Sequence, residues 1–212
     1  MDVNGLLAKL IQSQGPIIKR LARPLYKIPE EEGKRCAVAT YGWLQNTFQD
    51  NIDVSECGPY RLLFENYYKI NGAGKDEDWR QTFFDLLQRR DDKMSFADVL
   101  QHLYDKKKSV EPVFSSKLLA TIRPELSPYD QHVGDTLGIH MPTYQKNRLR
   151  QIRNCSRVYC VFQEMTSQIV QAKAFSCIRT LFDKTFGEHT HFTDVKKLDF
   201  FLWQYDREGA TE

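Results

Sequence analysis

Lys117 and Asp130 are the two residues whose types and spacing best suit shared chemistry. Lys117 lies near the start of an apolar helical run, and Asp130 follows it by 13 residues, after a loop at 123–128. A lysine amine whose pKa is lowered by burial or by a nearby cation can attack an electrophilic carbon and form an imine. A carboxylate beside it can stabilise developing positive charge and relay protons. The pair therefore suits a nucleophile with a carboxylate partner.

The same residues also have ordinary structural interpretations. A lysine in the first turn of a helix is usually a solvated side chain. Asp130 follows Pro128 and suits a helix N-cap, where its side chain accepts hydrogen bonds from free backbone N–H groups. His132 fits a structural, hydrogen-bonding histidine better than a catalytic base. Both the catalytic and the structural interpretation stay open for Lys117 and Asp130.

The elements that must position these residues are predicted to be helices. Apolar residues at helical spacing predict short helices over 113–122 and 129–139. Further helices are expected over 3–13, 34–50 and 60–70, after the predicted N-caps Asp76 and Ser95, over 143–186 as two helices, and from Thr193 onward. No alternating strand pair is found, so the sequence predicts an all-α fold of about nine to ten helices. We expect one domain over 1–212, with lobes at about 1–110 and 111–212 and a cleft between them.

A basic segment follows the Lys117 and Asp130 region. Between residues 141 and 157 the chain has five basic residues and no acidic one. Lys146, Arg150, Arg153 and Arg157 are spaced i, i+4, i+7 and i+11, which places them on one stripe of a helix. Such a stripe can follow a phosphate backbone and give salt-dependent binding to nucleic acid. A merely solvated helix face is the alternative.

The composition indicates a soluble protein of a reducing compartment. Five cysteines at irregular spacings do not form a disulfide framework, which favours the cytoplasm. No run of 18 apolar residues is present, so no membrane span is expected. The spacings of Cys155 with Cys160 and of His189 with His191 do not suit zinc. We therefore expect neither a metal nor another cofactor.

Several short segments resemble the helix-hairpin-helix DNA glycosylases, a superfamily that includes the 8-oxoguanine DNA glycosylases. They are residues 114–117 (Phe-Ser-Ser-Lys), 128–133 (Pro-Tyr-Asp-Gln-His-Val) and 137–138 (Leu-Gly). In that superfamily a hairpin turn leads to a lysine at the start of a helix, followed by a Val-Asp-x-His-Val element and by Leu-Gly. Residues 191–204 also resemble the C-terminal end of compact bacterial proteins with the 8-oxoguanine glycosylase fold. Elsewhere the likeness is only one of helix content.

The resemblance implies an all-α DNA glycosylase that flips a damaged or modified base out of double-stranded DNA and cleaves its N-glycosidic bond. Lys117 is then the nucleophile, and Asp130 is its electrostatic or acid–base partner. An imine intermediate would also permit strand cleavage by β-elimination. Oxidised guanine is the family-level substrate, and a modified base of invading phage DNA is an alternative. A monomer acting in a bacterial-type cytosol is expected.

The resemblance also implies a base pocket and a phosphate contact. The candidates for lining the pocket are Phe114, Tyr129, His132 and Trp203. The hairpin of the family carries a Gly-x-Gly turn whose backbone N–H groups hold a DNA phosphate. Residues 113–116 contain no glycine, so Ser115 and Ser116 are the candidate donors to phosphate at this turn.

Two alternative functions come from other classes. A DNA-binding protein that keeps the glycosylase scaffold without catalysis fits the glycine-free turn at 113–116. A helical protein-interaction domain requires no nucleic acid at all. Salt-dependent DNA binding without base excision would favour the first alternative, and absence of DNA binding at low salt would favour the second.

Overall fold

The protein is all-helical. The computed structural model describes residues 2–29 and 31–209, and these form eleven α-helices and two short 3-10 helices. The α-helices are α1 Val3–Gln12, α2 Gln14–Leu21, α3 Ala37–Gln49, α4 Gly58–Tyr68, α5 Glu77–Gln88, α6 Phe96–Lys107, α7 Pro112–Ile122, α8 Gln131–Leu137, α9 Arg148–Gln171, α10 Phe175–Thr185 and α11 Asp194–Gly209; the 3-10 helices are η1 Asn71–Ala73 and η2 Gly187–His189. Apart from one isolated bridge between Tyr26 and Arg35, the described residues contain no β-structure. The prediction of an all-α fold is confirmed.

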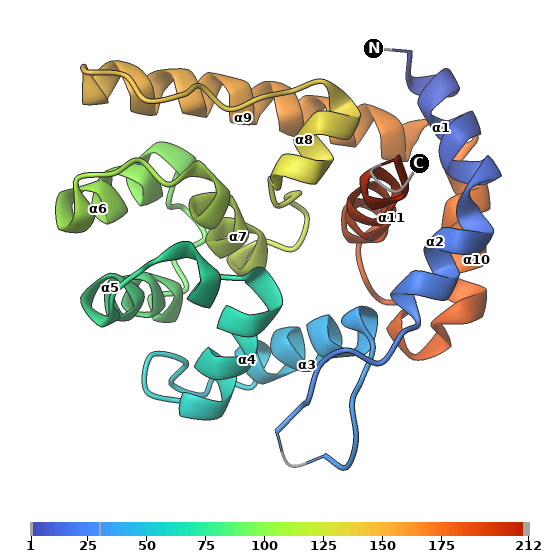
Figure 1. Cartoon of the computed structure of the whole chain (residues 1–212), viewed down its shortest axis with the longest axis horizontal. Helices are drawn as coiled ribbons and strands as arrows, with labels where there is room; N and C mark the ends of the chain where they lie inside the picture. Colours follow the sequence, from blue (N-terminus) through green and yellow to red (C-terminus); the bar gives the residue numbers. More distant parts are fainter. Residues whose placement is uncertain (1, 30, 210–212) are drawn as a thin grey trace.

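The helices pack in two groups that the long helix α9 connects (Figure 1). In one group α3 packs on α4, and α5, α6 and α7 pack on one another. In the other group α1 and α2 pack on α10 and α11, and α8 packs on α11. The N-terminal helices α1 and α2 pack against the C-terminal helices α10 and α11, and the expected lobe boundary near residue 110 stays a prediction.

Side-chain caps fix the beginnings of α5 and α6. The Asp76 carboxylate accepts a hydrogen bond from the Trp79 backbone N–H at 2.9 Å. The Ser95 hydroxyl accepts from the Asp98 backbone N–H at 3.2 Å, and the Asp98 carboxylate accepts from the Ser95 backbone N–H at 2.9 Å. These contacts satisfy backbone donors that the first turn of a helix leaves free. The prediction of N-caps at Asp76 and Ser95 is confirmed.

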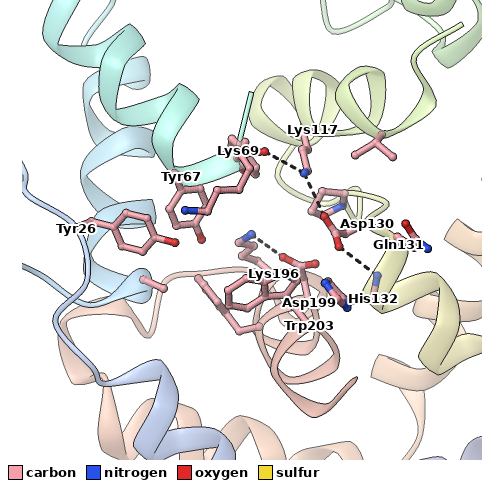
Figure 2. A pocket seen from close by; sticks show the side chains of 15 residues that line it. Tyr26, Tyr67, Lys69, Lys117, Asp130, Gln131, His132, Lys196, Asp199 and Trp203 are labelled. Carbon is pink, nitrogen blue, oxygen red and sulfur yellow. Dashed lines mark hydrogen bonds and ion pairs between the residues drawn. The ribbon is translucent and has the colours of Figure 1, made fainter. Parts of the chain in front are cut away.

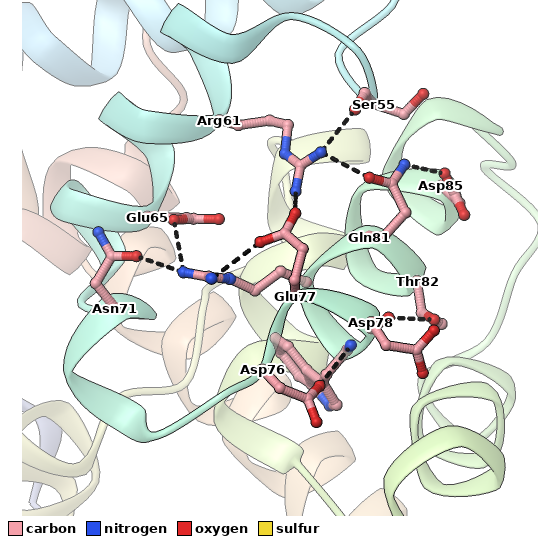
Figure 3. Close-up of polar contacts among 12 residues, drawn as sticks. Ser55, Arg61, Glu65, Asn71, Asp76, Glu77, Asp78, Gln81, Thr82 and Asp85 are labelled. Atoms are coloured by element: carbon pink, nitrogen blue, oxygen red, sulfur yellow. Dashed lines mark hydrogen bonds and ion pairs between the residues drawn. The ribbon is translucent and has the colours of Figure 1, made fainter.

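Two arginines tie α4 to α5 (Figure 3). Arg61 on α4 donates to the Gln81 side-chain oxygen on α5 at 2.7 Å and pairs with the Glu77 carboxylate. Arg80 on α5 pairs in the opposite direction with Glu65 on α4, at 3.6 Å. Because these contacts run both ways, they fix α4 against α5. The C-terminal end of α4 reaches the candidate site.

Helix α11 is unusual because apolar and charged residues are buried on it together. Leu198, Phe201 and Leu202 are fully buried, while Lys196 and Asp199 are 4% and 8% exposed. Each buried apolar side chain contributes roughly 1.5–3 kcal/mol to the free energy of unfolding. The apolar residues therefore anchor α11 and hold the two charged side chains inside the protein.

Gly134 allows α8 to lie close to the neighbouring chain. A Cβ atom at this position would lie 2.6 Å from both the Ile139 carbonyl oxygen and the Tyr129 hydroxyl. We expect Gly134→Ala to lower the free energy of unfolding by about 1–3 kcal/mol, because these atoms must move apart. Urea denaturation measures this change. Gly15→Ala is the control, since nothing lies within 4 Å of its added Cβ; equal effects at the two positions would contradict the close packing of α8.

Candidate active site

Lys117 lies in the second turn of α7 and points into the interior of the protein (Figure 2). Its side chain is only 9% exposed. The Nζ atom lies 3.2 Å from Oδ2 of Asp130 and donates to the Tyr68 carbonyl oxygen at 3.4 Å. The two residues that the sequence singles out are therefore in contact, and the interpretation of Lys117 as a solvated lysine is wrong.

Asp130 is at once the N-cap of α8 and the partner of Lys117. Its Oδ1 accepts a hydrogen bond from the His132 backbone N–H at 3.2 Å, while its Oδ2 faces the Lys117 amine. The side chain is 23% exposed. The structural and the chemical interpretations of Asp130 are thus compatible, because the capping bond fixes the direction in which the second oxygen points.

The surroundings of Lys117 favour the neutral amine. Burial lowers the pKa of Lys117 from its ordinary value, and the Asp130 carboxylate raises it by a smaller amount. Two residues of α11 act on the same amine, because Asp199 raises its pKa and Lys196 lowers it. A lowered pKa increases the fraction of unprotonated amine near neutral pH, and only the unprotonated amine is a nucleophile.

A pocket of about 350 Å³ lies beside the Lys117–Asp130 pair. Its walls come from the loop before α3, the end of α4, α7, the start of α8, and α11 (Figure 2). Tyr26, Tyr67 and Trp203 provide aromatic surface, and His132 provides a polar edge. The volume falls in the range of roughly 300–1,000 Å³ that is common for small-molecule sites. His132 and Trp203 line this pocket, and their contact with a base stays a prediction.

Phe114 and Tyr129 do not line this pocket. Phe114 is 8% exposed, and its ring packs edge-on against Trp79 at 5.4 Å between centroids. Tyr129 is 4% exposed, packs against Phe162, and donates its hydroxyl to the Ile139 carbonyl oxygen at 3.1 Å. The prediction that these two rings contact a flipped base is wrong, because both belong to the hydrophobic core.

The segment before Lys117 also differs from the expectation. Residues 113–116 belong to α7, and the chain turns earlier, at 108–111. Ser115 and Ser116 are fully buried. The Ser116 hydroxyl accepts from the Tyr129 backbone N–H at 2.9 Å. The prediction that these serines donate to a DNA phosphate is wrong, because their side chains are enclosed by protein.

Three arginines of the predicted basic stripe share α9. Arg150, Arg153 and Arg157 are all exposed. Lys146 is exposed as well but precedes Asn147, the N-cap of α9, so its predicted place on the helical stripe is wrong. Contact of these side chains with phosphate stays a prediction.

Sequence reasoning alone does not identify the wall of the pocket opposite Lys117. Lys196 and Asp199 on α11 line this wall and form an ion pair, and Lys69 lies at the end of α4. A signal for the α11 pair exists in the sequence. The helix carries apolar residues on several sides, including Leu198 and Phe201, so charged residues between them must be buried as well.

Comparison with protein-family models, with curated proteins and with solved structures gives no match for this chain. Among the described residues, no helix is both long and apolar enough to cross a membrane. The function is therefore inferred from the geometry and the charges of the pocket itself.

Proposed function

We propose that this protein is a DNA glycosylase that excises a damaged or modified base. The observation that carries the proposal is the contact between the buried Lys117 amine and the Asp130 carboxylate, at 3.2 Å, in the wall of a partly aromatic pocket. A nucleophilic amine beside a carboxylate is the pair that this reaction needs. The pocket volume of about 350 Å³ suits a single flipped base.

The reaction follows from the positions of the two side chains. The neutral Nζ of Lys117 attacks C1′ of the deoxyribose, and the bond from C1′ to the base breaks. The base leaves with the electron pair of that bond and takes up a proton. Asp130 stabilises the positive charge that develops on the sugar. The attached nitrogen loses a proton, the C1′–O4′ bond breaks with O4′ taking up a proton, and an imine forms between Lys117 Nζ and C1′. Removal of a proton from C2′ then expels the 3′ phosphate by β-elimination and cuts the strand, and hydrolysis of the imine releases Lys117.

Covalent trapping tests this proposal directly. Sodium borohydride reduces an imine to a stable amine, so an active protein becomes cross-linked to DNA that carries the correct lesion. We expect cross-linking to duplexes with an abasic site and to at least one member of a panel of oxidised or modified bases. No cross-link on any of these substrates would argue against an imine-forming glycosylase.

The exposed arginines of α9 are the proposed DNA contacts. We expect the Arg150→Glu/Arg153→Glu variant to bind duplex DNA at least about tenfold more weakly than the wild type. The slope of log affinity against log salt should become smaller in magnitude by about 2, since each lost phosphate contact removes about one released counterion. Fluorescence anisotropy over a salt series measures both quantities. Lys173→Glu/Lys184→Glu makes the same charge change at exposed residues in and before α10. Equal losses in the two variants would show only a net-charge effect.

A DNA-binding protein without catalysis is the second candidate. The start of α7 favours it, because the Glu111 carboxylate at the N-cap position pairs with Lys75 where the resemblance implies a phosphate contact. Binding through α9 with no trapping and no excision on the full lesion panel would select this function. Absence of DNA binding at low salt would point instead to a protein-interaction domain.

A further inference from the structure

A second Lys–Asp pair lies in the pocket, across from Lys117 and Asp130 (Figure 2). Lys196 Nζ lies 2.6 Å from Asp199 Oδ2, three residues apart on α11, and the side chains are only 5% and 11% exposed. Burying two charges costs solvation free energy, so such a pair often adds little to stability. Its position in the wall of the pocket therefore calls for a functional explanation.

Aromatic rings hold the Lys196 ammonium in place. Its Nζ lies 4.1 Å from the centroid of the Tyr41 ring and 4.7 Å from that of Phe200. Burial raises the pKa of Asp199, and the Lys196 ammonium opposes this by lowering it. The pair thus places an amine and a carboxyl group at fixed, largely buried positions in the wall of the pocket.

We infer that Lys196 and Asp199 are positioning residues that set the protonation state of the Lys117 amine. The inference rests on the proposed function for its consequence in catalysis, since a nucleophilic amine must be neutral at the working pH. Charges interact several-fold more strongly in a buried site than in water. Lys196 therefore disfavours the Lys117 ammonium by repulsion, and Asp199 favours it by attraction.

Charged and titratable groups face Lys117 from every element around the pocket. The pocket is lined by the following such groups: Tyr26 in the loop before α3; Tyr67, Tyr68 and Lys69 at the end of α4; Asp130 and His132 at the start of α8; and Lys196 and Asp199 on α11. Burial lowers the pKa of Lys117 most, the two aspartates raise it, and Lys196 lowers it. Removal of Asp199 takes away an attraction on the Lys117 ammonium, whereas removal of Lys196 takes away a repulsion. The two substitutions must therefore act in opposite directions.

The reactivity of the Lys117 amine toward formaldehyde tests this inference without DNA. The neutral Nζ attacks the aldehyde carbon, the carbonyl oxygen leaves as water, and hydride from cyanoborohydride reduces the resulting imine to a methylated amine. The rate follows the fraction of neutral amine, so a pH series gives a midpoint for this residue. Mass spectrometry of the peptide that contains Lys117 measures the rate in the folded, full-length chain.

We expect Asp199→Asn to move this midpoint to lower pH and Lys196→Met to move it to higher pH. The two midpoints should differ by on the order of one pH unit, as expected for a single charge at a buried site. Lys196→Arg keeps the positive charge and should follow the wild type. If Lys196 and Asp199 served only to stabilise the fold, the two variants would not shift the Lys117 midpoint in opposite directions. Coincident midpoints, or midpoints in the reverse order, would overturn the inference.

Lys197 provides a matched control on the same helix. It is 3% exposed and pairs with Asp183 of α10 at 2.7 Å, and neither residue lines the pocket. Lys197→Met and Asp183→Asn should leave the Lys117 midpoint at the wild-type value. If Lys196→Met does not fold, the comparison uses Asp199→Asn and Asp183→Asn alone. A lower Lys117 midpoint in Asp199→Asn than in Asp183→Asn supports the inference, and equal midpoints refute it.

Formaldehyde reactivity and DNA trapping separate this inference from the proposed function. If the Lys117 midpoints of Asp199→Asn and Lys196→Met differ but no protein is trapped on DNA, the glycosylase proposal is refuted. The influence of Lys196 and Asp199 on the Lys117 amine is then still supported. Trapping on DNA with coincident midpoints would retain the glycosylase and refute the role of Lys196 and Asp199.

Discussion

A Lys117→Ala variant is expected to lose covalent trapping on abasic DNA by roughly a thousandfold or more, because the proposed nucleophile is removed. The contact of its amine with Asp130 at 3.2 Å and its place in the pocket wall make it the amine that a flipped sugar would meet. Gel separation of the borohydride-reduced cross-link measures the loss. DNA binding through α9 should stay close to the wild-type level, since those arginines belong to another helix.

Two further variants decide whether the loss is chemical. Lys117→Met retains most of the side-chain volume, so it should lose trapping as completely as Lys117→Ala while it preserves the packing of α7. Lys69→Met removes another lysine of the same pocket, one that is exposed, and should leave the cross-link intact. Trapping that survives in Lys117→Met and disappears in Lys69→Met would assign the nucleophile to Lys69.

The fold could be predicted from the sequence because its signals are local. Apolar residues at helical spacing and N-caps such as Asp76 and Ser95 act within one or two turns of chain, so they mark helices without knowledge of the partners. The grouping of helices is not local. The contact of α1 and α2 with α10 and α11 joins the two ends of the sequence, and no spacing within either segment contains that information.

The candidate site was predictable only in part, for the same reason. Lys117 and Asp130 can be singled out from the sequence because their types, their spacing and the Asp-x-His-Val segment are local features of the chain. The direction of an aromatic ring is set by tertiary packing, which is why Phe114 and Tyr129 were predicted in a pocket and lie in the core. Charged residues are usually exposed, so the apolar residues on several sides of α11 are the one local sign that Asp199 is buried, and the packing of α11 on α8 and α2 shows where it lies.

Asp130→Asn is expected to slow base excision by about 10²- to 10⁴-fold with little change in thermal stability. An asparagine at the N-cap can still accept the hydrogen bond from the His132 backbone N–H, which Asp130 now accepts at 3.2 Å. The charge beside Lys117 is lost, and with it the stabilisation of the cationic sugar. Single-turnover excision kinetics and thermal denaturation measure the two effects separately.

Asp130→Asn should make trapping on abasic DNA begin at lower pH, although the same substitution slows base excision. An abasic sugar already presents an aldehyde, so this reaction needs the neutral amine of Lys117 but no departure of a base. The Asp130 carboxylate raises the pKa of Lys117, and its removal therefore lowers that pKa and moves the onset of trapping to lower pH. Asp130→Ala removes the cap as well and should cost about 1 kcal/mol of stability in addition. Excision at the wild-type rate in Asp130→Asn would show that the carboxylate serves only to cap α8.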